Sequence, residues 1–241
     1  MKVLLLILAS DTAPEYLQFQ RLWRLYMKSN PNVHCYFYKG HPDLTQPAFL
    51  EDDTLWIRIN ESLETVYEKT LRAFEYFLPV LKDYNYVFRS NLSTVVAFPQ
   101  MLDYCATLPR TKCCAAVIGG IPREEEDRNS LSHGFSFPGG NGFLLSPDLV
   151  RRLVEEKEPL VVQDDVTIGV ALRKWDVPIQ EFARPDYMND ATWYLNGTHL
   201  LEPKDWNLNP KKLLFSYRLK TDDRSKDVEM MRNLIRRFYT V

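Results

Sequence analysis

An uninterrupted apolar run, VLLLILA, occupies residues 3–9, preceded by Lys2 and followed by Ser10. Such a run fits either the core of a secretory signal or a parallel strand that is covered on both faces. As a signal core, seven residues are at the short end of the usual length. The neighbouring residues decide between the two interpretations.

Residues 10–15 favour the strand. Ser10 or Asp11 can cap a helix, Thr12 and Glu15 have the spacing of a capping box, and Pro14 suits a first helical turn. An apolar run that ends where a helix begins is typical of a βα unit. We therefore expect residues 3–9 to form the first strand of a folded domain.

Further along the chain, strand patterns and helix patterns alternate. Strands are predicted at 33–38, 54–59, 86–89, 113–118 and 143–145, and helices at 63–78, 99–107, from 147, near 165 and at 228–238. Residues 119–142 have no steady period and are predicted to form a long surface loop. The alternation predicts an α/β fold with a mostly parallel, Rossmann-type sheet flanked by helices. No repeat or linker divides the chain, so a single domain over 1–241 is expected.

Composition removes several classes of function. A net charge of −2 gives no overall field that would attract nucleic acid or an anionic membrane. Apart from residues 3–9 there is no long apolar stretch, so we expect no membrane span and a cytoplasmic location. The cysteines offer no CxxC metal site and are predicted to be reduced and mostly buried: Cys35, Cys105, Cys113 and Cys114.

Two segments hold the most chemistry. GGNGFLLSP has glycines at 139, 140 and 142, which allow the backbone to approach another group closely. VVQDDVTIGVAL has Asp164 and Asp165 just before an apolar helix. There, a carboxylate can serve as a general base, or it can simply cap the helix.

The order of these segments resembles inverting glycosyltransferases of the GT-A fold, especially the fringe and β-1,3-galactosyltransferase group. In that group a small-Gly-x-Gly-apolar-apolar-Ser stretch precedes an acidic pair, and NESLETVYEKT at 60–70 is similar to its Glu-Ser…Lys-Thr segment. The resemblance implies transfer of a sugar from a nucleotide-sugar donor, a UDP-sugar, to a hydroxyl of a glycan acceptor with inversion. It implies Asp165 as the general base, with Asp164, Gly140, Asn141 and Gly142 binding the acceptor.

The chain departs from that group at the D-x-D element, which holds Mn²⁺ against the donor diphosphate. YVFRSNLST stands there, so Asn91 and Ser93 occupy the positions of the first and third aspartates. Neutral side chains are poor ligands for a hard divalent cation. No cofactor is therefore expected, and Mn²⁺ is the alternative if a weak site persists at these two residues. Ser216 stands near the position expected for the group's late metal-ligand histidine.

Basic residues are the candidates for holding the donor diphosphate without a metal. The predicted donor-binding residues are Ala9, Ser10, Asp11, Arg58, Lys69, Arg89, Ser90, Asn91, Arg218 and Lys220. Lys69, Arg218 and Lys220 also fit ordinary exposed charges. A second hypothesis is a glycosyltransferase-like domain that binds carbohydrate or nucleotide without catalysis. A third, an unrelated nucleotide-binding α/β protein, lacks a GxGxxG or GxxxxGK[ST] motif.

Overall fold

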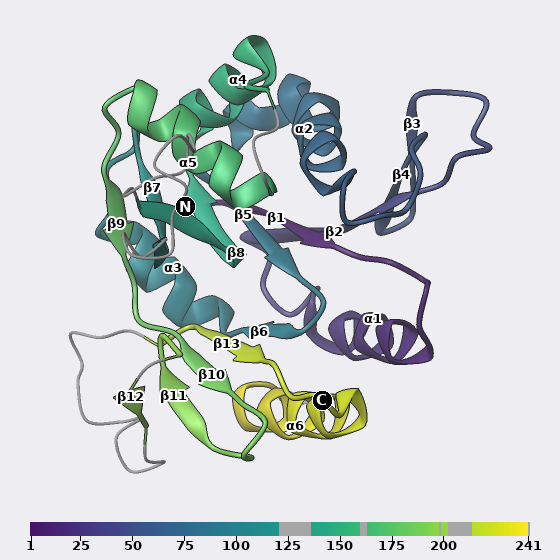
Figure 1. The fold of residues 1–241 in the computed structure, drawn as a ribbon, viewed down its shortest axis with the longest axis vertical. Coiled ribbons are helices and arrows are strands. Elements are labelled where there is room, and N and C mark those ends of the chain that lie inside the picture. The colour runs from purple at the N-terminus through teal and green to yellow at the C-terminus, as the bar shows by residue number, and fades with distance from the viewer. Residues whose placement is uncertain (121–135, 160–162, 198, 202–213, 241) are drawn as a thin grey trace, which may run out of the picture.

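A computed structural model describes residues 1–120, 136–159, 163–197, 199–201 and 214–240. Two sheets organise this part of the chain (Figure 1). The larger has the spatial order β3 (Ala48–Glu51), β4 (Thr54–Ile57), β2 (Val33–Gly40), β1 (Val3–Leu8), β5 (Tyr86–Asn91), β8 (Ser136–Leu145), β7 (Cys114–Gly120), β9 (Ile179–Glu181). The smaller has the order β12 (His199–Leu200), β11 (Trp193–Leu195), β10 (Pro185–Tyr187), β13 (Ser216–Leu219), β6 (Thr94–Val96).

The larger sheet is mostly parallel. Strands β4, β2, β1 and β5 run parallel to one another, and β7 runs parallel to β9. Strand β3 is antiparallel to β4, and β8 is antiparallel to both of its neighbours. With helices on both faces, this arrangement confirms the predicted α/β class (Figure 1).

Strand β1 runs through the middle of the hydrophobic core. Val3, Leu5 and Ile7 pack with residues of α1 (Pro14–Tyr26), α3 (Phe98–Ala106) and α6 (Arg224–Phe238). Leu4 and Leu6 pack on the other side with residues of α2 (Val66–Phe77), α4 (Pro147–Glu156) and α5 (Asp164–Lys174). Because successive side chains point to opposite faces and both faces are covered, the run has no polar positions. The structure confirms the strand at the start of the chain.

The predicted cap of α1 is wrong. The helix begins at Pro14, as expected, but its N-cap is Ala13 and no side chain bonds to the helix start. Ser10 Oγ accepts a hydrogen bond from Thr12 N at 3.2 Å, and Asp11 binds Lys39 Nζ at 2.9 Å. These side chains are bound to other groups and are not available to cap the helix.

Helix α2 is shorter than predicted because its expected first turn is a separate loop. Thr65 Oγ1 donates to the carbonyl of Asn60 at 2.7 Å, and Leu63 is 92% exposed. The helix therefore begins at Val66. Pro79 ends it as predicted, in a 3₁₀ turn over Leu78–Asp83.

The predicted loop over 119–142 is also wrong in part. Residues 121–135 lie outside the described residues, but β8 begins at Ser136, so the glycines at 139, 140 and 142 lie within a strand. The neighbouring elements approach them closely. A Cβ at Gly140 would lie 2.8 Å from Asp165 Oδ2, and one at Gly142 would lie 3.0 Å from the Phe88 ring. Close packing, and not chain flexibility, accounts for these glycines.

The cysteines follow the prediction. All four are buried free thiols, Cys35, Cys105, Cys113 and Cys114. Burial raises the pKa of each thiol, that of Cys113 to about 11. They therefore remain protonated near neutral pH and belong to the hydrophobic core.

Candidate functional site

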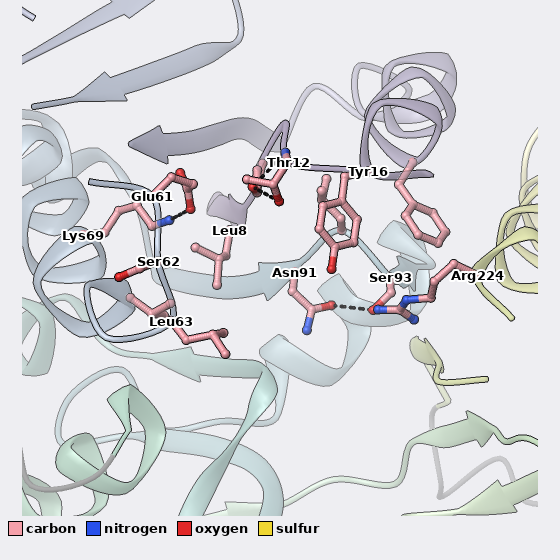
Figure 2. Close-up of a pocket in the computed structure, with 15 residues that line it drawn as sticks. Leu8, Thr12, Tyr16, Glu61, Ser62, Leu63, Lys69, Asn91, Ser93 and Arg224 are labelled. Atoms are coloured by element: carbon pink, nitrogen blue, oxygen red, sulfur yellow. Dashed lines mark hydrogen bonds and ion pairs between the residues drawn. The ribbon is translucent and has the colours of Figure 1, made fainter. Parts of the chain in front are cut away.

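A cavity of about 460 Å³ lies at the carboxyl ends of β1 and β5, the edge at which open α/β sheets bind ligands (Figure 2). Its wall comes from the end of β1 and the segment after it, from α1, from the start of α2 and the loop before it, from the turn after β5, and from the first residue of α6. Four predicted donor-binding residues line it, Ala9, Ser10, Lys69 and Asn91, and Ser93 lines it as well.

Lys69 forms the inner wall of this cavity and is bound to an acid. The residue is fully buried, and its ammonium donates to Glu61 Oε1. Burial lowers the pKa of Lys69, and Glu61 opposes that effect. The second carboxylate oxygen of Glu61 accepts from Gly40 N at 2.7 Å. Because Glu61 balances its charge, Lys69 adds little net positive charge to the cavity.

Asn91, the last residue of β5, lines the cavity and bonds to β8. Its Nδ2 donates to Asn141 Oδ1 at 2.9 Å. Its Oδ1 accepts from Ser93 Oγ at 3.3 Å and from Thr94 Oγ1 at 3.0 Å. Thr94 Oγ1 is also 3.2 Å from the carbonyl oxygen of Asn141, so these amides and hydroxyls form one continuous network.

This network does not fit Mn²⁺. Asn91 and Ser93 supply one amide oxygen and one hydroxyl where the resemblance implies two carboxylates, and that amide oxygen already accepts two hydrogen bonds. Among the described residues, no group of three or more His, Cys, Asp or Glu side chains is arranged to hold a metal ion. The absence of a cofactor requirement stays a prediction.

The acid pair forms the first turn of α5 beside this network. Asp164 is buried and accepts from Arg89 Nη2 at 2.5 Å. Arg89 also donates from Nη1 to the Gly140 carbonyl and from Nε to Tyr38 Oη at 3.2 Å. Burial opposes the charge on Arg89, but Asp164 and Tyr38 outweigh it, and the net effect raises the pKa of Arg89. Arg89 therefore stays charged inside the protein, with a partner at each of its three guanidinium nitrogens.

Asp165 is held by two backbone groups. Its Oδ1 accepts from Val166 N at 2.9 Å, and its Oδ2 accepts from Gly140 N at 2.9 Å. Burial, followed by the negative charge of Asp164, raises the pKa of Asp165 above its ordinary value. A carboxylate with a raised pKa is a stronger base, which suits removal of a proton near neutral pH.

Two consecutive residues of β8 connect the acid pair to the cavity. Gly140 N bonds to Asp165, and Asn141 bonds to Asn91 in the cavity wall. Gly142, the third predicted acceptor-binding residue, lies opposite Ser90 of β5 in the same ladder. The strand thus positions a candidate base next to a candidate ligand cavity.

Other predicted donor-binding residues lie away from this cavity or are bonded elsewhere. Asp11 accepts from both Lys39 and Gln20. Arg58 lines a second cavity, of about 780 Å³, on the other side of α2. The buried Ser90 hydroxyl has no hydrogen-bond partner among the described residues.

Arg218 and Lys220 belong to the smaller sheet. Arg218 lies in β13, opposite Asp186 on one side and Thr94 on the other. Burial, followed by the positive charge of Arg184, lowers the pKa of Arg218 to about 10. Lys220 follows the strand and is exposed, and the buried Ser216 hydroxyl has no partner within the described ranges. Neither basic residue lines the cavity, although Thr94, which lies opposite Arg218 in the ladder, bonds to Asn91.

Sequence reasoning missed several residues of the cavity wall, among them those that come from α1 and α6. Tyr16 and Phe19 of α1 and Arg224 of α6 all line it (Figure 2). The amphipathic pattern indicates which helix face is buried, but it does not indicate that α1 and α6 pack together at the end of β1. One sequence feature could have pointed to Arg224: an acid, Asp227, follows it by three residues. In the structure Asp227 accepts a hydrogen bond from Arg224 at 2.5 Å.

Comparison with solved structures gives matches at the level of the fold, and a distant one is described here. No protein-family model and no curated protein matches the chain. A structural neighbour is the crystal structure of a glycosyltransferase involved in the glycosylation of the major capsid of PBCV-1. It is 8% identical, the match covers 96% of this chain and 99% of that chain, and the TM-score is 0.48. The roles proposed for individual residues rest on the site and not on this likeness. No helix of the described residues is long and apolar enough to cross a membrane.

Proposed function

We propose that this chain is an inverting glycosyltransferase of GT-A type that moves a sugar from a UDP-sugar to a hydroxyl of a glycan acceptor. One observation carries the proposal: β8 joins a buried acid with a raised pKa to a cavity at the carboxyl edge of a parallel sheet. The cavity is of a size that suits a small-molecule ligand. The sequence resemblance assigns the donor to that edge and the base to Asp165.

The reaction is a single displacement. Asp165 removes the proton from the acceptor hydroxyl as the oxygen attacks the anomeric carbon of the donor. The bond from that carbon to the acceptor oxygen forms while the bond to the nucleotide diphosphate breaks, and the diphosphate leaves with the electron pair. Because attack and departure occur on opposite faces, an α-linked donor gives a β-linked product.

The neighbours of Asp165 position it for this role. Gly140 N and Val166 N each bond to one oxygen, which fixes the orientation of the carboxylate and leaves a lone pair on each oxygen. Asp164 contributes negative charge beside Asp165 while Arg89 holds it in place. We propose that Asp164 and the backbone at Asn141 bind hydroxyl groups of the acceptor.

A non-catalytic domain that binds carbohydrate or nucleotide is the second candidate. It is favoured by the two backbone bonds to Asp165, which also fit a purely structural carboxylate at a helix start. The two proposals differ in one measurable property, because a binding domain gives no product.

The deciding experiment compares sugar transfer by the native chain and by Asp165→Asn, using a panel of UDP-sugars and oligosaccharide acceptors. We expect transfer by the native chain, a loss of about 10²- to 10⁴-fold in kcat for the variant, and unchanged UDP binding. Asp148→Asn is the matched control, because Asp148 is also in the first turn of a helix but lies outside the site. Near-normal turnover by Asp165→Asn removes its role as base, and a product of retained configuration by NMR rules out the single displacement.

A further inference from the structure

Arg224 stands at one side of the cavity, with half of its guanidinium bonded to protein. Figure 2 shows its side chain reaching from the start of α6 toward Ser93, across the cavity from Lys69 and Glu61. Its Nη1 donates to Asp227 Oδ2 at 2.5 Å and to the carbonyl oxygen of Leu219 at 3.2 Å. Among the described residues, none accepts a hydrogen bond from Nε or Nη2 of Arg224.

The bonded half is rigidly supported. Asp227 is fully buried and also accepts from Thr221 N at 3.1 Å and from Thr221 Oγ1 at 2.8 Å. Three donors thus converge on Asp227, and Arg224 cannot rotate without losing both this carboxylate and the Leu219 carbonyl. A guanidinium held at Nη1 presents its Nε and Nη2 protons side by side, spaced to meet two oxygens of one phosphate or carboxylate.

Among the cavity-lining residues that the structure describes, Arg224 is the cation that remains available to a ligand. Lys69 is fully buried and bound to Glu61, and Lys39, which does not line the cavity, is bound to Asp11. The side chain of Arg224 is 35% exposed. It therefore combines partial exposure with an open pair of donors, which the buried lysine lacks.

We propose that the free edge of Arg224 binds a phosphoryl group of the ligand in this cavity, the diphosphate of the nucleotide donor. This inference rests on the proposed function for the identity of the donor, but the chemistry requires only a tetrahedral oxyanion. Asp227 offsets part of the arginine's charge, so binding depends on the two aligned donors more than on net attraction. A lysine at this position has the charge but not the paired donors.

Binding of UDP, uridine and inorganic pyrophosphate, measured by calorimetry in the presence of EDTA, tests the inference. Arg224→Gln is expected to weaken UDP and pyrophosphate roughly 10- to 100-fold and to leave uridine unchanged. Arg224→Lys is expected to recover only a minor part of that loss. Arg232→Gln, which removes an exposed arginine from the same helix, is the matched control and is expected to bind UDP normally.

The outcomes separate this inference from the proposed function. Native UDP affinity in Arg224→Gln, or an equal loss for uridine, overturns the role of Arg224 while leaving the donor intact. Pyrophosphate binding that depends on Arg224, with no binding of any nucleotide, overturns the proposal that the ligand is a nucleotide donor but supports an anion site at Arg224. UDP binding that requires Mn²⁺ and ignores Arg224 overturns the inference. Circular dichroism and the thermal midpoint show whether each variant folds.

Discussion

Two arginines close to the candidate site are held in opposite ways. Arg89 is 2% exposed, and Nε, Nη1 and Nη2 each have a partner, in Tyr38, Gly140 and Asp164. Arg224 has partners at Nη1 only among the described residues, and its side chain lines the cavity wall (Figure 2). The first arginine fixes the positions of its neighbours, whereas the second has donors left for a ligand.

The difference shows how to judge whether a basic residue near a site is available to bind a ligand. In the sequence, Arg89 adjoins the altered D-x-D segment and attracts a phosphate role, while Arg224 has the pattern of an ordinary residue at a helix start. A buried guanidinium with a partner at each nitrogen is less available to a ligand than a partly exposed one, because displacing a partner costs free energy in a dry environment. The number of unused donors, and not proximity in sequence, separates the two.

Removal of Arg89 is expected to give the largest effect on stability. Arg89→Met leaves Asp164 buried without its cation, which we expect to cost about 3–5 kcal/mol of unfolding free energy in urea titrations. Arg224→Met also leaves a buried carboxylate without its cation, but Asp227 keeps its bonds from Thr221 and Arg224 is partly exposed, so we expect a smaller cost of about 1–3 kcal/mol. Equal losses for the two variants would remove the distinction between them.

Gly140→Ala tests, through activity, whether the close contact of Gly140 with Asp165 positions that carboxylate. The added Cβ would lie 2.8 Å from Asp165 Oδ2 and 3.2 Å from its Cγ, so the carboxylate must move. We expect kcat to fall about 10²-fold, the scale of a displaced catalytic group, with the Kd for UDP unchanged. A variant that loses UDP affinity and keeps kcat would show that Gly140 serves the cavity and not Asp165.

The pH dependence is expected to follow Asp165. Transfer needs the ionised base, so kcat/KM falls as pH drops through the raised pKa of Asp165. Asp164→Asn removes the neighbouring negative charge and leaves the positive charge of Arg89, which lowers the pKa of Asp165. The acidic limb of the kcat/KM profile is therefore expected to move to lower pH. An acidic limb that stays in place would assign it to another group.

The same shift has a consequence for stability. The native state binds the proton of Asp165 more tightly than the unfolded chain does, because the native pKa is the higher one. The contribution of Asp165 to stability is therefore present at low pH and is lost as pH rises through the native pKa. Urea midpoints measured against pH are expected to show this loss for the native chain and not for Asp165→Asn.

Much of the fold can be predicted from local patterns in the sequence. The strands at 33–40 and 86–91 and the helices at 98–106 and 224–238 lie close to where periodicity puts them, because each buries one face or both. The full length of strand β8 is not predictable in this way, since its glycines and proline carry no strand pattern. Its glycines are instead explained by the close approach of Phe88, Val117 and Asp165, which are distant in sequence.

The candidate site is only partly predictable for the same reason. Asn91 is the last residue of β5, and Lys69 lies near the start of α2, which begins at the same edge of the sheet, so their presence at the cavity follows from topology. Arg224 comes from the last helix, and its place there depends on α1 and α6 packing together. Arg58 lies at the other cavity because β4 ends at Ile57 and the chain turns away before α2.

The smallest expected effect concerns what holds Arg224 in place. Asp223 caps α6 by accepting from Ser225 N at 3.0 Å, and Asp223→Ala is expected to cost about 1 kcal/mol in urea denaturation, the usual cost of losing such a cap. UDP affinity is expected to stay within about twofold of native, because Asp227 and the Leu219 carbonyl still fix Nη1. If UDP affinity instead falls as far as in Arg224→Gln, then the helix start, and not the buried carboxylate, positions the arginine, and the contrast with Arg89 depends on the cap.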